Sequence, residues 1–475
     1  MSRVTRAKSL LVLTFFLLLL LLAVYPALAA PEPAGWYKQP SGTTSDISFI
    51  SAVNPTVAWG TSSQGIIKTA DGGNNWTKTT SQPALGPIAA VDANTAWVAG
   101  NSNFTICKTI DGGATWTTQF QTEYSAHWTY FVYGICAVDA NTAWACGALA
   151  YLDTPDYGVH AVVMRTTDGG LNWSPAYFGN TGSMCLGISA LDANTAWTCG
   201  RDTSTNSPVM KTVNGGTTWV PQAPVIPNAI TTGISAVDEN HAFAVSSTQC
   251  STPEHSYILK TTDGSNWNAS DMGTDFGVRG VEAVGPDKAW VVGTRGTILH
   301  TSDGTNWTAQ QSGTTANLAS ISAVDANIAW ASGASGTILH TTTGGIIPPP
   351  APASISPAYA VQGTVVKATI NGTGFQEGAT VRLEGPTVIN ATGVTLVSPT
   401  QLSCTLDLWT NTPPLGKYDV VVRNVDGQEG KLVKGFSVTN ICGGGAGASI
   451  AVFGCFLGLL SLTGTSRLVR RKRKR

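Results

Sequence analysis

One phrase recurs seven times along this chain of 475 residues, and this repeat limits the possible folds more than any other feature. A clear copy is ISAVDANIAW, from Ile321 to Trp330, and an apolar run and a turn follow it. Other copies are CAVDANTAW, which ends at Trp144, and SALDANTAW, which ends at Trp197. Self-similarity at a period of tens of residues indicates a repeat architecture.

Each repeat contains four short extended segments, typified by ISAVD, TAWACG, GTILHT and the residues around N-W-T. A D-A-N-T turn separates the first two segments, since Asp and Asn bond their own backbone and tolerate left-handed dihedrals. A D-G-G turn separates the last two. Four antiparallel strands that repeat radially form the blade of a β-propeller. A β-solenoid would also repeat, but it favours shorter and more uniform rungs, so the propeller is the preferred interpretation.

The aromatic residue in each second strand gives the number of blades. These residues are Trp59, Trp97, Trp144, Trp197, Phe243, Trp290 and Trp330. Only six turn-and-tryptophan elements follow them, but the segment that starts at Trp36 matches the one at Trp307 in the pattern W-x-x-Q-x-S-G-T-T. We therefore predict an all-β, seven-bladed propeller over residues 31–346, whose N-terminal strand completes the last blade and removes exposed sheet edges.

The turn before each tryptophan follows the pattern S/T-x-D-x-G-x-x-W, which resembles the Asp-box, or bacterial neuraminidase repeat. Its Asp and Trp residues are Asp71, Trp76, Asp111, Trp116, Asp168, Trp173, Trp219, Asp263, Trp267, Asp303 and Trp307. Asn214 replaces Asp in one copy, and the copies at Asp263 and Asp303 are one residue short. Residues 36–346 also resemble the propeller of photosystem II assembly and stability factors. The Asp-box resemblance implies a structural role, with Asp and Gly in a tight hairpin and Trp between blades.

The N-terminal residues 1–29 have the features of a secretory signal peptide: a basic start, an apolar run and a small-residue cleavage site that ends at Ala29. After the propeller, residues 347–353 form a predicted Pro-rich linker. Short alternating strands over residues 354–439 then indicate an immunoglobulin-like β-sandwich. This region resembles the IPT/TIG family through its SISP opening, Gly372–Phe375 and Tyr418–Gly427. Such modules act mostly as spacers or protein-binding units.

The C-terminus combines a Cys/Gly-rich motif at 440–445, which contains Cys442, with an apolar stretch at 446–466 and a basic tail at 467–475. About twenty apolar residues suffice to span a bilayer, and a basic tail stays in the cytoplasm. We predict a C-terminal transmembrane helix and an exported, cell-surface protein anchored by it. The motif resembles prokaryotic C-terminal sorting signals, so processing at Cys442 and a plain anchor both remain open.

Composition and cysteines give further expectations. Charged residues make up 12% of the chain and the net charge is −1, so no nucleic-acid partner is expected. Cys136 with Cys146, and Cys185 with Cys199, lie on the first two strands of one blade each, so cross-strand disulfides are possible, although Cys146 with Cys199 is an alternative. The histidines lack metal-ligand spacing, so neither a metal nor a cofactor is predicted.

The insertions in the repeats point to a binding face. The D-A-N-T turns and Asp-boxes share one face, whereas the longer connections lie on the opposite face, and loops on a rigid scaffold are the usual carriers of binding. The candidate ligand-binding residues are Tyr124, His127, Trp128, Tyr130, Tyr133, Tyr151, Tyr157, Arg201 and His255. The carboxylates of Asp153, Asp156 and Glu254 would suit glycoside hydrolysis, but solvated loop carboxylates are more common.

These features favour a non-enzymatic surface protein that presents a propeller on an immunoglobulin-like stalk and binds an extracellular protein or glycan. The first alternative is a sialidase-type glycoside hydrolase, but the R-I-P motif of sialidases is missing from the sequence. The second alternative, implied by the assembly-factor resemblance, is an assembly factor for a membrane complex. No catalytic residue is assigned.

Overall fold

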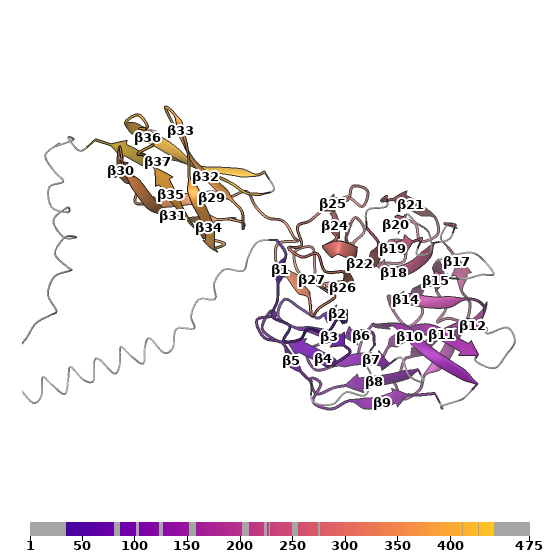
Figure 1. The fold of residues 1–475 in the computed structure, drawn as a ribbon. Helices are drawn as coiled ribbons and strands as arrows, with labels where there is room; N and C mark the ends of the chain where they lie inside the picture. The colour runs from indigo at the N-terminus through magenta and orange to yellow at the C-terminus, as the bar shows by residue number, and fades with distance from the viewer. Residues whose placement is uncertain are drawn as a thin grey trace, which may run out of the picture. The chain divides into compact units, whose positions relative to one another are not determined.

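The computed structural model describes residues 35–440, except for 80–85, 101–103, 123–126, 152–157, 202–208, 223–225, 228, 249–254, 274–275, 411 and 426. The chain divides into two compact units, residues 1–348 and residues 349–475. Strands make up the regular structure of both units (Figure 1), and the one helical element among the described residues is a 3-10 turn, η1 (Thr294–Gly296). The predicted all-β class is therefore confirmed.

The first unit consists of four-stranded antiparallel sheets, seven of them within its described residues. Sheet 1 contains β2 (Ile47–Ala52), β3 (Ala58–Ser62), β4 (Gly65–Thr69) and β5 (Thr77–Lys78). Sheet 2 contains β6 (Ile88–Ala90), β7 (Ala96–Gly100), β8 (Thr105–Thr109) and β9 (Thr117–Phe120). Sheet 3 contains β10 (Trp128–Ala137), β11 (Ala143–Tyr151), β12 (Val159–Thr166) and β13 (Ser174–Thr181).

The remaining sheets follow the same order along the chain. Sheet 4 contains β14 (Met184–Ala190), β15 (Ala196–Arg201), β16 (Val209–Thr212) and β17 (Val220–Pro221). Sheet 5 contains β18 (Ile230–Ala236), β19 (Ala242–Ser247), β20 (Ser256–Thr261) and β21 (Trp267–Asp271). Sheet 6 contains β22 (Val278–Gly285), β23 (Lys288–Gly293), β24 (Ile298–Thr301) and β25 (Thr308–Ala309). Sheet 7 contains β26 (Leu318–Ala323), β27 (Ala329–Gly333), β28 (Ile338–Thr341) and β1 (Tyr37–Lys38).

The N-terminal strand completes sheet 7, as the sequence match at Trp36 predicts. Tyr37 pairs with His340, and Lys38 pairs with Leu339, so β1 is the outer strand of that sheet. The Trp36 indole donates a hydrogen bond of 2.7 Å to the Gln310 side chain of sheet 6. The two ends of the repeat region are thus joined by strand pairing and by side-chain contacts.

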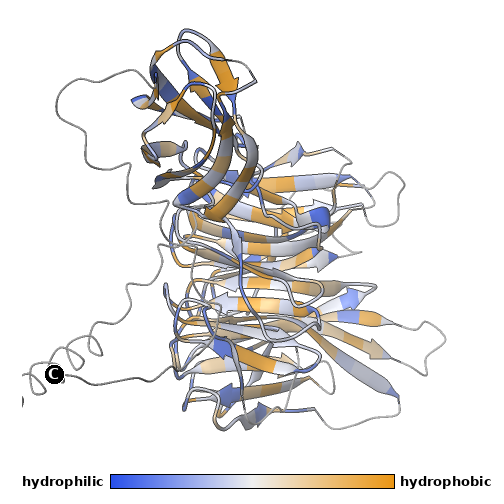
Figure 2. Cartoon of the chain, turned by 60° about the vertical axis from the view of Figure 1, so that its left-hand side comes forward, coloured by the Kyte–Doolittle hydropathy of each residue, from blue (hydrophilic) through white to orange (hydrophobic). Residues whose placement is uncertain are grey.

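At five of the sheet junctions, an Asp-box tryptophan packs edge to face against an aromatic ring of the preceding sheet. Trp76 of sheet 1 meets Trp330 of sheet 7 edge to face, with ring centroids 5.7 Å apart. The same geometry recurs at 5.7–6.2 Å for Trp116–Trp59, Trp173–Trp97, Trp219–Trp144 and Trp307–Phe243. Each pair consists of an Asp-box tryptophan and the second-strand aromatic of the preceding sheet. Edge-to-face pairs stabilise a fold by roughly 0.5–1.5 kcal/mol beyond the effect of burying their surface. Figure 2 shows where hydrophobic residues lie along the strands of the sheets.

Basic residues on the third strands serve the same junctions. The ammonium groups of Lys68, Lys108 and Lys211 each lie 4.4–4.5 Å from the centroid of the tryptophan in their own sheet. Each also donates a hydrogen bond to a turn carbonyl of the next sheet. These cations therefore contribute to the junctions between neighbouring sheets.

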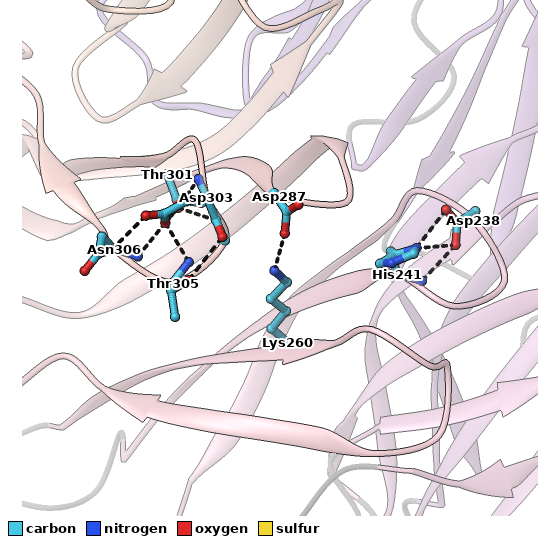
Figure 3. Close-up of polar contacts among 9 residues, drawn as sticks. Asp238, His241, Lys260, Asp287, Thr301, Asp303, Thr305 and Asn306 are labelled. Carbon is cyan, nitrogen blue, oxygen red and sulfur yellow. Dashed lines mark hydrogen bonds and ion pairs between the residues drawn. The ribbon is translucent and has the colours of Figure 1, made fainter.

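The Asp-box turns have the structural role that the resemblance implies. In the second copy, the Asp111 carboxylate accepts hydrogen bonds from the Thr115 side chain and backbone and from the Thr109 hydroxyl. These bonds lower the pKa of Asp111 to about 2. Asn214 forms the equivalent contacts with Thr212 and Thr218, which explains why Asn can stand there. Figure 3 shows the shortened copy, in which Asp303 accepts from Thr301 and Asn306.

The second unit has two sheets around one hydrophobic core. One sheet has the order β29-β31-β35-β34, and the other has the order β30-β37-β36-β32-β33. The strands are β29 (Ala351–Ser356), β30 (Tyr359–Val361), β31 (Val365–Thr373), β32 (Thr380–Glu384), β33 (Val388–Asn390), β34 (Thr392–Ser398), β35 (Gln401–Asp407), β36 (Gly416–Arg423) and β37 (Glu429–Thr439). The buried Tyr418 donates its hydroxyl hydrogen to the Pro414 carbonyl, four residues earlier in the chain.

The prediction of a membrane-anchored surface protein has to be corrected. Within residues 35–440, gaps excepted, no helix is long and apolar enough to cross a membrane. The predicted signal peptide with Ala29, the motif with Cys442 and the stretch 446–466 lie outside the described residues. β29 also begins at Ala351, so the last three residues of the predicted linker belong to the sandwich.

Candidate functional site

Sheet 3 is the most extended of the seven sheets. Its strands have 10, 9, 8 and 8 residues, whereas the outermost strands of the other six sheets have two to five. Its length comes from the chain around Trp128 to Tyr133 and from the strand that ends at Tyr151, both of which the sequence marks as insertions. Sheet 3 therefore carries several of the residues predicted to bind a ligand.

Four aromatic side chains form a row across the far end of sheet 3, one from each strand. Trp128 and Tyr151 are cross-strand partners with ring centroids 6.5 Å apart. His160 lies 5.5 Å from Tyr151 and stacks on Phe178 at 5.1 Å. Trp128 is 40% exposed and Phe178 is 55% exposed. We call Trp128, Tyr151, His160 and Phe178 the aromatic row.

The other predicted residues of this region lie in different surroundings. Tyr130 packs against Phe104 of sheet 2, and burial raises the pKa of its hydroxyl. His127 lies beside Trp128, with ring centroids 6.3 Å apart. Tyr133 stacks on Phe131 and points to the centre of the unit, where it lines a cavity. Tyr124 and Tyr157 lie outside the described residues.

The central cavity has a volume of about 210 Å³, and the innermost strands of all seven sheets line it. Six of these strands contain a β-bulge near the lining residues, and the extra residues are Ser48, Tyr133, Leu186, Thr232, Arg279 and Ala319. A bulge redirects a side chain out of the regular strand alternation. Arg279 is the charged residue among those lining the cavity. These bulges were not predictable from the sequence, because a bulge leaves no mark in an apolar repeat.

A few residues after each bulge, small polar side chains connect neighbouring innermost strands. The Ser51 hydroxyl accepts a hydrogen bond of 2.9 Å from the Ala90 amide, and the same bond recurs at Ser189, Ser235 and Ser322. Glu282 occupies this position in sheet 6. Burial raises the pKa of Glu282 to about 8, although the Ser235 hydroxyl and the Ala323 amide donate to it. This acidic residue was missed in the sequence because it stands at the serine position of the I-S-A-V phrase and looks like one more variant of the repeat.

The remaining candidates do not join the aromatic row. Arg201 is the last residue of β15 and pairs with Met184. His255 directly precedes β20 of sheet 5, its Nδ1 lies 3.2 Å from a carboxylate oxygen of Asp271, and its ring stacks on Tyr257. Asp153, Asp156 and Glu254, the carboxylates considered for hydrolysis, lie outside the described residues.

The four propeller cysteines considered for disulfides are free thiols in the structure. Cys136 pairs with Trp144 and not with Cys146, and Gly187 rather than Cys185 pairs with Cys199. The strand register therefore offsets both predicted pairs, and burial raises the pKa of Cys146. Among the described residues, no group of three or more His, Cys, Asp or Glu side chains could hold a metal ion.

Comparisons with known proteins agree with the fold. Residues 259–347 match the family described as photosynthesis system II assembly factor YCF48. This match covers sheets 6 and 7 with part of sheet 5, and it names an assembly factor, so it gives no support to the surface-anchored localisation predicted above. No curated protein matches the sequence.

Solved structures resemble the chain at low identity. RRP9 WD40 repeats are 9% identical with a TM-score of 0.50, covering 66% of this chain and 98% of that chain. YCF48 bound to D1 peptide is 17% identical with a TM-score of 0.48, covering 67% and 99%. The GH74 xyloglucanase from Xanthomonas campestris is 11% identical with a TM-score of 0.47, covering 85% and 74%. The likeness to the WD40 repeats concerns the fold alone, and the other two add nothing to the assignment of a function.

Proposed function

We propose that the seven sheets form one closed seven-bladed propeller that acts as a non-enzymatic platform for a protein partner. The observation that carries this proposal is the aromatic row on sheet 3. Trp128 and Phe178 are exposed at its two ends, whereas most large apolar side chains of the sheets are buried. Exposed aromatic side chains on a rigid scaffold are favoured at recognition surfaces.

The aromatic row suits binding because its side chains are already held in place before a partner binds. Each ring contacts a neighbour on the adjacent strand, so Tyr151 and His160 are held between Trp128 and Phe178. A side chain that is fixed before binding loses less conformational entropy when a partner covers it. Tyr and Trp also offer large apolar faces together with a polar group at the edge.

A protein is the favoured partner because part of the chain is similar to an assembly factor. A glycan would also stack on aromatic rings, so the test below includes glycan binding as one of its outcomes. The second unit, which resembles an IPT/TIG module, serves in this proposal as a spacer or an additional binding unit.

Catalysis is the less favoured alternative. Hydrogen bonds from backbone and side-chain donors of Asn172, and from Thr166, lower the pKa of Asp168 to about 2. A carboxylate held in this way is a poor general acid, because such an acid needs a pKa near the working pH. The Asp-boxes therefore supply no catalytic pair of the kind that glycoside hydrolysis requires.

The test is a selection with the full chain as bait against a display library of random 12-residue peptides, in parallel with a glycan array. We expect peptides that bind the wild type and lose about tenfold or more in affinity on Trp128→Ala. Ser270→Ala on β21 is the matched control at an exposed outer-strand position. Selective glycan binding in place of peptide binding, or turnover of a bound glycan, would contradict the proposal.

A further inference from the structure

The junction between sheets 3 and 4 differs from the equivalent junctions in one side chain. In the four full-length Asp-boxes and in the corresponding turn of sheet 7, the second glycine faces a residue on the outer strand of the preceding sheet or directly after it. At four junctions this residue is Gln39, Thr79, Gln119 or Gln310. At the junction of sheets 3 and 4, Gly216 faces Ala176. Alanine is the smallest of these five side chains, so it leaves space on the outer rim.

A groove occupies this place. It has a volume of about 410 Å³, and Ala176, Tyr177, Phe178, Gly216 and Trp219 contribute to its lining. The rings of Tyr177 and Trp219 lie 6.0 Å apart at an angle of 57°, so they form two walls of a corner. All residues that line the groove are uncharged.

The tryptophan at the base of the groove is held by the backbone. The Trp219 indole donates a hydrogen bond of 3.0 Å to the Ala176 carbonyl. At the junction of sheets 6 and 7, the corresponding indole of Trp36 donates to the Gln310 side chain instead. With alanine at position 176, a backbone carbonyl orients the indole, and no side-chain amide takes the place that Gln310 has beside Trp36.

The geometry of β13 limits the kind of ligand that the groove can bind. This strand ends the sheet, but it contains Pro175 and two irregularities in its pairing with β12. Bulges and proline blunt a sheet edge, so β13 is a poor template for adding a strand. An uncharged, aromatic-walled groove instead suits a polyproline II segment, which has no internal hydrogen bonds and docks its rings on aromatic faces.

We infer that the groove between β13 and the Asp-box of sheet 4 binds a proline-rich segment of the partner in the polyproline II conformation. This inference rests on the proposed function, because Phe178 borders the groove and belongs to the aromatic row. The row and the groove then receive two adjacent parts of one partner chain.

The probe is a fluorescent decaproline peptide, titrated into the full chain and followed by anisotropy. The decisive variant is Ala176→Gln, which restores the side chain found at three equivalent junctions and fills the groove. We expect the wild type to bind decaproline and Ala176→Gln to bind at least about tenfold more weakly. The melting temperature of the variant should not fall, because glutamine is accommodated at the other junctions.

Two controls separate the possible outcomes. Ser270→Gln places the same side chain on the outer strand of sheet 5 and should leave decaproline binding unchanged. A peptide of alternating threonine and valine tests strand addition, and preferential binding of this peptide would overturn the inference, as would decaproline binding that survives Ala176→Gln or is undetectable. If library-selected peptides still depend on Trp128 in either case, the proposed function stands while the groove inference fails.

Discussion

Replacing Glu282 by glutamine should stabilise the first unit at alkaline pH and change little in acid. Glu282 occupies a position where Ser51, Ser189, Ser235 and Ser322 stand in other sheets, and burial raises its pKa to about 8 from an ordinary 4.5. The unfolded chain releases this proton above pH 4.5, whereas the folded chain retains it until about pH 8. Wild-type stability should therefore fall as the pH rises through this interval and level off above it.

The magnitude follows from the difference between the two pKa values. That difference is 8 − 4.5 = 3.5, and at about 1.4 kcal/mol per pKa unit the ceiling is roughly 5 kcal/mol. The residue is only partly buried, so solvent should reduce the penalty. We expect Glu282→Gln to gain about 2–3 kcal/mol over wild type at pH 9, and less than about 0.5 kcal/mol at pH 4.

The assay is urea unfolding followed by tryptophan fluorescence at pH 4, 7 and 9. Glu239→Gln is the matched control, because Glu239 is an exposed carboxylate on a turn of sheet 5, and it should show no gain that grows with pH. Glu282→Ser should follow the glutamine variant, since serine accepts the same amide hydrogen bond in other sheets. An equal stability difference between Glu282→Gln and wild type at pH 4 and pH 9 would refute the reasoning.

Three further predictions concern the scaffold. Trp36→Ala should cost about 3–5 kcal/mol, because this side chain is buried beside Trp290, and a melting temperature within a degree of wild type would show that β1 does not close the unit. Burial lowers the pKa of His340 to about 4, so wild-type stability should fall as the pH drops from 6.5 through 4, and His340→Asn should flatten that part of the pH profile. Asp111→Asn should lower the melting temperature less than Asp111→Ala does, because Asn214 forms the equivalent hydrogen bonds in another copy of the turn; equal losses in thermal unfolding would contradict this.

The repeat pattern predicted the scaffold well because each of its signals is local. The Asp-box has its hydrogen bonds within a few residues, as the contacts of Asp111 with Thr109 and Thr115 show. The closing strand was visible because Trp36 and Trp307 begin the same nine-residue pattern. The pairing of Tyr37 with His340 follows from that match.

The candidate site was predicted only in part, because it depends on register. Trp128 and Tyr151 were identified as inserted aromatics, but His160 and Phe178 join them through cross-strand positions in a strand with irregular pairing. Similarly, Arg279 reaches the central cavity through a bulge, and Ala176 matters only by comparison with the glutamines at other junctions. The predicted membrane-anchored localisation was wrong: it was based on the apolar composition of residues 446–466, and no helix among the described residues could cross a membrane.

The most direct test of the binding proposal is hydrogen–deuterium exchange of the full chain with and without a peptide selected from the display library. Trp128 to Thr181 contains the four strands of sheet 3 and the whole aromatic row. We predict slower exchange in peptic fragments from this span when the peptide is bound, and little change in the Asp-box turns of sheets 1 and 6. Protection confined to those turns, or to the second unit, would contradict the assignment of sheet 3 as the binding surface.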